Sequence, residues 1–191
     1  LILDYMAGIP LDKFAHHYNL LPFAKTIEII ETLARVIEYL HSQNIISMDM
    51  KDKNVMWDGK KATYFDFGVS QIIIPERINL VEPFITSLLT TPEYSAPEMA
   101  LTFTAYKRTD IFQLGILFYR LLAGKNPFAR YDLYDFQEGD DYRESEIIKF
   151  SLPAIFNDID GTPEVFAKYP EILRLISEML EKDFRKRPEP W

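Results

Sequence analysis

The sequence contains no cysteine and no uninterrupted apolar run long enough to span a membrane. The absence of cysteine excludes disulfides, thiolate zinc sites and cysteine nucleophiles, and it fits a reducing compartment such as the cytoplasm. The longest apolar stretch, residues 111–123, is interrupted by Gln113, Tyr119 and Arg120. It therefore predicts a buried helix rather than a membrane span, and we expect no membrane segment in this chain.

Positive charge is scarcer than negative charge. There are 21 lysines and arginines against 29 acidic residues, which gives a formal net charge of −8. A surface of that sign repels a phosphate backbone, so we expect no nucleic acid as a partner. Low-complexity segments and internal repeats are also missing. With 191 residues, 48% of them hydrophobic, the chain can bury one sizeable core, and we expect one domain or most of one.

Three segments have the apolar periodicity of amphipathic helices. Apolar residues recur at 3.6-residue spacing in 25–43, again from Ile111 to Leu122, and again in 171–182. Gly124 follows the second segment and is expected to stop it. Two short strand-like runs, Asn54 to Trp57 and Ala62 to Phe65, flank the turn dipeptide Asp58-Gly59 and predict a hairpin.

The remaining segments are short or polar. Residues 1–4 are strand-like, 7–10 are turn-like, and the acidic stretch 131–146 is expected to be a surface loop. The predicted fold is therefore mainly α with a small β-hairpin, of the α+β class.

The run Asp49-Met50-Lys51-Asp52-Lys53-Asn54 has the composition of a phosphoryl-transfer site. A carboxylate at 49 can orient a hydroxyl group and accept its proton, and the ammonium of Lys51 can neutralise a migrating phosphoryl group. The amide oxygen of Asn54 can bind a hard cation. Taken alone, Asp49 would be interpreted as a helix-capping or loop aspartate. Its occurrence together with Lys51, Asn54 and Asp66 changes that interpretation.

A second carboxylate, in Asp66-Phe67-Gly68, follows the predicted hairpin. The hairpin turn is expected to bring Asn54 and Asp66 together. One oxygen ligand from each forms a reasonable Mg²⁺ site when nucleotide phosphates supply the other ligands. His16, His17 and His41 lack metal-ligand spacing and are left as surface or core residues.

In this order and at this spacing, the motifs resemble those of the eukaryotic-type protein kinases of serine/threonine type. The resemblance covers nearly the whole chain. The segments that carry it are 49–54, Asp66-Phe67-Gly68, Thr91 to Glu98 with its Ala-Pro-Glu end, Asp110 with Gly115, and 183–188. It implies ATP and Mg²⁺ as cofactors and a protein substrate with a serine or threonine hydroxyl.

The resemblance also assigns roles around the reacting groups. Asp49 matches the catalytic base and Lys51 the loop lysine, while Asn54 and Asp66 match the two magnesium ligands. Thr91 is implied to bond to Asp49 or Lys51.

On the nucleotide side, backbone groups of Asp4 and Met6 match the hinge that holds adenine, and Met56 matches the floor beneath the ring. By pattern alone, Met6 and Met56 are equally well read as core residues. The implied organisation is a partial kinase domain over 1–191. Residues 1–8 end the small lobe and hinge, and 9–191 form the helical C-terminal lobe, with a catalytic loop at 47–55 and an activation segment at 66–98.

Two structural roles are implied as well. Asp110 is expected to hold the catalytic-loop backbone from the start of the central helix. Arg187 is expected to pair with Glu98, because a buried charge needs a partner.

The sequence departs from the family pattern in two ways. Ser47 and Met48 stand where the family has histidine and arginine, so a packing element beside Phe67 is removed and the arginine that grips an activation-segment phosphate is missing. We therefore expect activity independent of activation-segment phosphorylation. No Gly-rich loop, strand lysine or partner glutamate precedes Leu1, so we expect the N-terminal lobe to be absent here and required in cis.

Three functions remain in view. The first is ATP-dependent phosphoryl transfer to serine or threonine hydroxyls of proteins, with this fragment inactive or weak alone. The second is a pseudokinase scaffold or binding module, favoured by Ser47 and Met48. The third is a small-molecule kinase of the antibiotic-phosphotransferase type, which shares the Asp49-to-Asn54 spacing but fits Asp66-Phe67-Gly68 with Ala96-Pro97-Glu98 less well.

Overall fold

The helices and strands of this chain are seen in a computed structural model that describes residues 6–13, 21–73, 91–102, 104–128 and 158–189. The strands are β1 (Ile9–Pro10), β2 (Ile45–Ile46), β3 (Val55–Trp57), β4 (Ala62–Tyr64) and β5 (Gln71–Ile72). The α-helices are α2 (Phe23–Ser42), α3 (Pro97–Thr102), α4 (Lys107–Ala123), α6 (Glu164–Lys168) and α7 (Pro170–Met179). Short 3₁₀ helices are η1 (Asp52–Asn54), η3 (Pro92–Tyr94) and η4 (Phe184–Lys186). The strand-like run 1–4 and the acidic stretch 131–146 lie outside the described residues.

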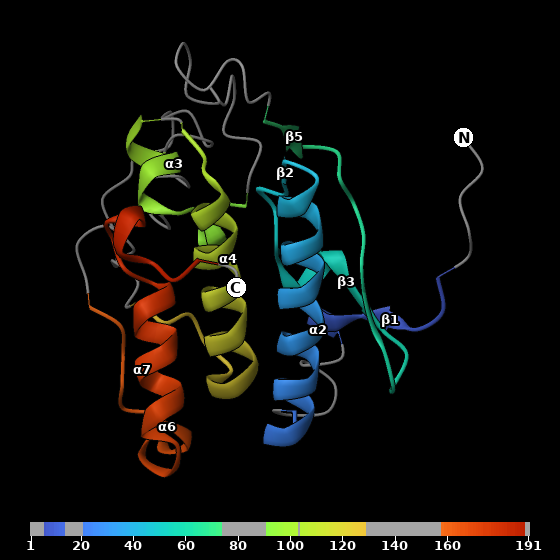
Figure 1. Cartoon of the computed structure of the whole chain (residues 1–191). Helices are drawn as coiled ribbons and strands as arrows, with labels where there is room; N and C mark the ends of the chain where they lie inside the picture. The colour runs from blue at the N-terminus through green and yellow to red at the C-terminus, as the bar shows by residue number, and fades with distance from the viewer. Residues whose placement is uncertain (1–5, 14–20, 74–90, 103, 129–157, 190–191) are drawn as a thin grey trace, which may run out of the picture.

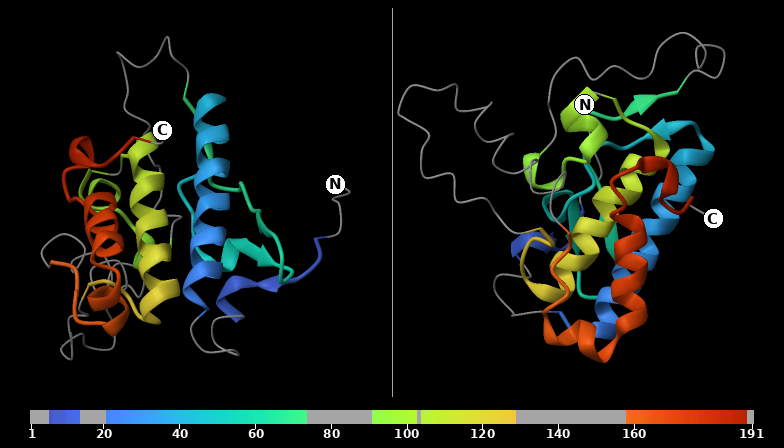
Figure 2. Two further views of the ribbon diagram at one scale, coloured as in Figure 1. Left: turned by 60° about the horizontal axis from the view of Figure 1, so that its bottom comes forward. Right: turned by 90° about the vertical axis from the view of Figure 1, so that its left-hand side faces the viewer.

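Three long helices stand side by side, with α4 between α2 and α7 (Figure 1). The strands β1, β3 and β4 lie on the side of α2 that faces away from α7, as both Figure 1 and the left view of Figure 2 show. Among the described residues, no helix is both long and apolar enough to cross a membrane.

Helix α2 buries the apolar stripe that predicted it, including Ile30, Leu33 and Ile37. It begins at Phe23, slightly earlier than the stripe indicates. The carbonyl of Pro22 accepts the backbone N–H groups of Lys25 and Thr26 at 2.8 and 3.0 Å, so the first turn is already closed there.

Helix α4 is buried on nearly all sides because a helix packs against each flank. Its end at Gly124 was predicted: this residue has φ 70°, and its N–H donates to the carbonyl of Arg120 at 2.9 Å. A left-handed conformation of this kind is favourable for glycine. At Gly115 a β-carbon would lie 2.9 Å from a Leu180 methyl carbon and 3.0 Å from the Met179 β-carbon, so the end of α7 approaches α4 closely at this glycine.

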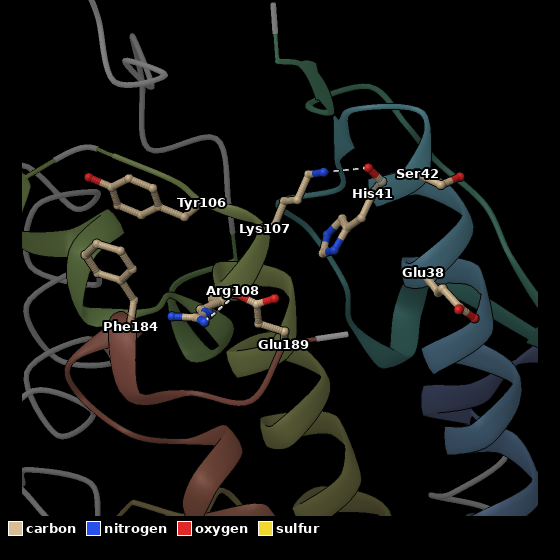
Figure 3. A pocket seen from close by; sticks show the side chains of 8 residues that line it. All are labelled: Glu38, His41, Ser42, Tyr106, Lys107, Arg108, Phe184 and Glu189. Atoms are coloured by element: carbon tan, nitrogen blue, oxygen red, sulfur yellow. Dashed lines mark hydrogen bonds and ion pairs between the residues drawn. The ribbon is translucent and has the colours of Figure 1, made fainter. Parts of the chain in front are cut away.

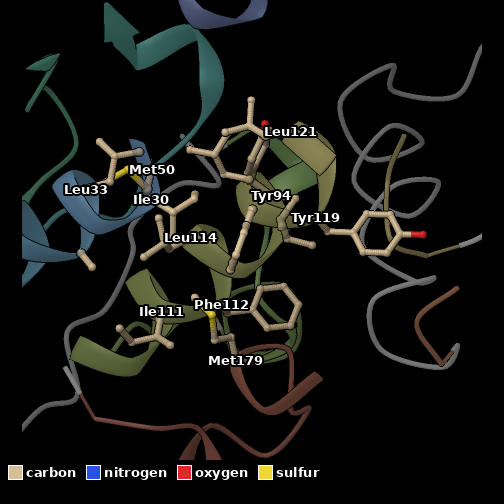
Figure 4. Close-up of a cluster of buried hydrophobic side chains, with 14 of the residues drawn as sticks. Ile30, Leu33, Met50, Tyr94, Ile111, Phe112, Leu114, Tyr119, Leu121 and Met179 are labelled. Carbon is tan, nitrogen blue, oxygen red and sulfur yellow. The ribbon is translucent and has the colours of Figure 1, made fainter. Parts of the chain in front are cut away.

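The last predicted helix is confirmed as α7, which buries Ile176 and Met179. Figure 4 shows part of the core where α2, α4 and α7 meet. Leu33 of α2, Leu114 of α4 and Met50 of the loop after β2 are all buried in this core. The core therefore lies directly under the segment that carries Asp49 and Lys51.

The predicted hairpin is also present. β3 and β4 pair antiparallel, with Val55 opposite Tyr64 and Trp57 opposite Ala62. Gly59 takes the positive φ (93°) that this turn requires.

Two further strand pairings were not predicted. β1 joins the hairpin as a third strand where the sequence indicated only a turn, with Ile9 opposite Trp57. Gly8 permits this pairing, since it has φ 108° and any β-carbon would lie 2.4 Å from the Trp57 carbonyl oxygen. β2 and β5 form a separate two-stranded sheet, with Ile46 opposite Gln71. Strands of two residues are too short to show an alternating pattern.

The Arg187–Glu98 pair expected from the sequence is present and buried. Nη1 and Nη2 of Arg187 lie 2.7 and 2.8 Å from the two carboxylate oxygens of Glu98. The remaining donors of Arg187 bond to backbone carbonyls, including that of Arg108 at 3.1 Å. This bidentate contact joins the start of α3 to the end of the described chain.

We predict that Arg187→Ala lowers the free energy of unfolding by about 3–5 kcal/mol, because it leaves the buried carboxylate of Glu98 uncompensated. Urea denaturation followed by circular dichroism measures this change. The matched control is Arg174→Ala, which removes an exposed arginine beside Glu178 and should change the value by less than about 0.5 kcal/mol. Equal stabilities of the two variants would contradict the prediction.

Candidate active site

The loop between β2 and β3 runs along helix α4 and is fixed to it at several points. Asp110, which is 0% exposed, accepts the backbone N–H of Ser47 at 2.9 Å and that of Met48 at 2.8 Å. Gln113, one helical turn on, accepts from the N–H of Met50 at 3.0 Å and donates to the Met48 carbonyl at 2.8 Å. The expected anchoring role of Asp110 is therefore seen, and Gln113 adds a second anchor.

Arg120 extends this attachment to the next part of the loop. Its guanidinium lies 3.5 Å from a carboxylate oxygen of Asp52 and 2.9 Å from one of Glu93, and it stacks over the Tyr94 ring at 5.2 Å. Gln113 and Arg120 are seven residues apart, so they lie on one face of α4. That face therefore holds both the loop and the segment 91–94.

His41 supplies a third donor to Asp110. Its Nε2 lies 2.8 Å from the carboxylate, and the ring is buried. No role was predicted for His41, because a histidine in a helix stripe has the pattern of any core residue. In the sequence, Gln113 and Arg120 only interrupt an apolar run, although a buried amide and guanidinium must find partners.

Asp49, Lys51 and Thr91 are brought together by this arrangement. The ammonium of Lys51 lies 2.6 Å from Asp49 Oδ2 and 2.7 Å from Thr91 Oγ1. Thr91 Oγ1 lies 3.5 Å from Asp49 Oδ1. Asp49 is buried, whereas Lys51 and Thr91 are half-buried. A carboxylate, a cation and a hydroxyl group thus meet at one point.

Asn54 fixes the orientation of Asp49 from the other side. Its side-chain nitrogen donates to the carbonyl and to Oδ2 of Asp49, both at 2.9 Å. Because the side-chain nitrogen of Asn54 faces Asp49, its amide oxygen points away from that carboxylate.

Asp66 follows β4, and Asn54 directly precedes the paired strand β3. The N–H of Phe65 donates to the Asn54 carbonyl at 3.0 Å, so the two strand ends meet as the hairpin predicted. Asp66 has an exposed side chain and a left-handed backbone with φ 68°, and its Oδ1 accepts the N–H of Gly68 at 3.0 Å. No group of three His, Asp or Glu side chains with metal-site geometry occurs in the described part of the chain. An amide and a carboxylate here would therefore need phosphate and water oxygens to complete a Mg²⁺ shell.

The residues expected around adenine are only partly described. Met56 lies on β3, opposite Pro10 of β1, and is half-buried. Met6 is 36% exposed and lies shortly before β1, so the chain that follows it runs beside Met56. Asp4 lies outside the described residues.

Two cavities adjoin this region. One, of about 710 Å³, is lined by Asp12, Lys51, Asp52, Lys53, Thr91, Glu93, Tyr94, Arg120, Gly124, Lys125, Asn126, Phe128 and Asp160. Within it, the ammonium of Lys125 bonds to Asp160 at 2.6 Å and lowers the pKa of that carboxyl to about 2. The other, of about 530 Å³, lies where α2 ends and α4 begins (Figure 3). His41 and Lys107 line it, but no expected site residue does. Of these two cavities, the one beside Lys51 and Thr91 is therefore the one that adjoins residues of the predicted site.

Comparison with known proteins agrees with this geometry. The family model described as protein kinase domain matches residues 1–190. The chain belongs to the eukaryotic-type protein kinase family. The family predicted from the motifs is thus confirmed, and the helix-rich fold with small sheets is consistent with that domain.

The relatives of this kinase-family chain include serine/threonine-protein kinases of bacteria and animals. It is 29% identical to the serine/threonine-protein kinase pkn2 of Myxococcus xanthus over 173 residues, which are 88% of this chain and 19% of that protein. It is 28% identical to the serine/threonine-protein kinase ULK3 of Homo sapiens over 155 residues, 80% of this chain and 31% of that protein. For PknB of Mycobacterium tuberculosis the identity is 26% over 130 residues, 68% of this chain and 20% of that protein. The chain thus spans less than a third of the length of each.

Proposed function

We propose that this chain takes part in ATP-dependent transfer of a phosphoryl group to serine or threonine hydroxyls of proteins. The observation that carries the proposal is the meeting of Asp49, Lys51 and Thr91, with Asn54 orienting the carboxylate. Positioning and charge neutralisation are what this reaction requires of a protein, since the phosphoryl group itself undergoes little covalent chemistry with it.

In the proposed reaction, the substrate hydroxyl oxygen forms a bond to the γ-phosphorus while the bond from that phosphorus to the leaving ADP oxygen breaks. Asp49 orients the hydroxyl group and accepts its proton. The ammonium of Lys51 neutralises charge on the migrating phosphoryl group, and Thr91 holds Lys51 and Asp49 at their mutual distance.

We further propose that Asn54 and Asp66 hold Mg²⁺ through their oxygen atoms. Two oxygen donors on adjacent strand ends suit a hard cation that keeps phosphate and water ligands. When bound, Mg²⁺ would neutralise the charge of the nucleotide phosphates. Met56, with the backbone at Asp4 and Met6, is proposed to contact adenine, and an N-terminal lobe in the same polypeptide is proposed to supply the phosphate-covering loop. The isolated chain should then transfer phosphate poorly.

A pseudokinase scaffold is the second candidate, and one observation favours it. Ser47 and Met48 replace the histidine and arginine of the family motif, and the Met48 side chain is 1% exposed inside the core. The retention of Asp49, Lys51, Asn54 and Asp66 favours the enzyme.

We predict that Asp49→Asn lowers kcat by about 10²–10⁴-fold, because asparagine keeps the size of the side chain but cannot accept the proton. The assay is transfer of labelled phosphate to a protein mixture by the full-length protein. Glu31→Gln, on the exposed face of α2, is the matched control and should leave kcat unchanged. A normal rate for Asp49→Asn would contradict the proposed role of this residue. A wild-type protein that binds other proteins but transfers no phosphate would favour the scaffold.

We also predict that phosphatase treatment leaves the transfer rate within about twofold of the untreated rate. Bidentate recognition of a phosphate group needs an arginine, and the buried thioether of Met48 cannot provide it. The comparison is made on the full-length protein, with mass spectrometry to verify that the activation segment carries no phosphate. Loss of activity on dephosphorylation would show that another group reads that phosphate.

A further inference from the structure

Phe67 has an aromatic neighbour that the sequence did not predict. Serine at 47 was expected to remove the packing element beside Phe67. In the structure, the ring of Tyr64 packs edge-on against Phe67, with ring centroids 5.3 Å apart and an angle of 87° between the planes. Phe67 is 49% exposed, and this is its only ring contact with another described residue. Tyr64 therefore packs beside Phe67, where Ser47 was expected to leave a packing element missing.

Tyr64 is in turn tied to Ser47. Their hydroxyl groups are hydrogen-bonded to each other, and both residues are buried. A serine at 47 is short enough to leave room for the tyrosine, and it offers a hydroxyl partner to the phenol.

The backbone of Ser47 cannot shift easily. Its N–H donates to Asp110 at 2.9 Å, and its carbonyl accepts the hydroxyl of Ser70 at 3.1 Å. A continuous set of contacts therefore runs from helix α4 through Ser47 and Tyr64 to the ring of Phe67.

Asp66 lies immediately before Phe67 and needs such support. A non-glycine residue with φ 68° is in a sparsely populated conformation, which persists only where the surroundings over-determine it. On one side the N–H of Phe65 bonds to Asn54, and on the other the Phe67 ring rests on Tyr64. The exposed carboxylate of Asp66 accepts a hydrogen bond at Oδ1 from the N–H of Gly68 at 3.0 Å, so its direction depends on the backbone of this turn.

We propose that Ser47 and Tyr64 act as one positioning unit that fixes the backbone at Asp66 and so aims its carboxylate at the metal. Neither residue touches the metal or the nucleotide in this account; both act through Phe67. The inference rests on the proposed function, because it takes Asp66 as a metal ligand. The competing explanation is that the two buried hydroxyl groups only satisfy each other's hydrogen-bonding needs and have no effect on Asp66.

A set of four proteins separates these explanations: wild type, Ser47→Ala, Tyr64→Phe and the double variant, each as the full-length protein. Affinity for Mn²⁺·ADP is measured by isothermal titration calorimetry, and stability by urea denaturation. Each single variant should bind about tenfold more weakly, the size seen when a support of a metal ligand is removed. The double variant should bind no more weakly than the singles, since one bond is lost in all three.

Stability should behave differently. Each single variant strands a buried hydroxyl group and should be less stable, whereas the double variant removes both partners and should recover most of that loss. Recovered stability with unrecovered affinity is the signature of positioning. The matched control is Tyr119→Phe, which removes another tyrosine hydroxyl, bonded to the Asp160 carbonyl at 2.6 Å, and should lower stability without changing affinity.

Two results would overturn the inference alone: wild-type affinity in both single variants, or affinity that follows stability in every variant, Tyr119→Phe included. A wild-type protein that binds no Mn²⁺·ADP would instead refute the proposed function, and the positioning role with it.

Discussion

The carboxylate of Asp110 is a negative charge buried completely at the start of the central helix. Such a charge is costly unless hydrogen-bond donors surround it. Here the donors are the N–H groups of Ser47 and Met48 and the ring of His41. If the loop or helix α2 moved, the carboxylate would lose hydrogen-bond donors. The need to keep these donors therefore holds the loop, helix α2 and helix α4 in fixed positions relative to one another.

Helix α4 supports the loop between β2 and β3, which carries Asp49 and Lys51. Asp110 holds the loop at its start, Gln113 holds its middle, and Arg120 reaches Asp52 further along. Arg120 also holds Glu93, so the segment that brings Thr91 to the site is fixed by the same helix. The positions of Asp49 and Lys51 therefore follow from side chains that do no chemistry, as preorganised sites require.

The sequence predicted the parts of this architecture that have a periodic or spacing signal. The three long helices and the hairpin showed apolar periodicity and a turn dipeptide, and the roles of Asp110 and Arg187 followed from a family resemblance. The supports of the site had no such signal. Gln113 only interrupts the apolar pattern of its helix, and Tyr64 has the pattern of an ordinary strand residue. Their roles depend on hydrogen bonds to Met48 and Ser47, which are distant in sequence. The two-residue strands β1, β2 and β5 depend on tertiary contacts and have no pattern to detect.

The most direct test of this account is the phosphotransfer rate of Asp110→Asn in the full-length protein, measured together with the Michaelis constant for ATP. Asparagine keeps the shape but loses the charge and one acceptor. Either the N–H of Met48, which bonds to Oδ1, or the N–H of Ser47 and the ring of His41, which bond to Oδ2, then lose their partner. The account predicts a kcat lowered by about tenfold to a hundredfold, the effect of small misplacement of reacting groups, with an unchanged Michaelis constant. A kcat equal to that of the wild type would show that the loop holds Asp49 in place without this buried charge.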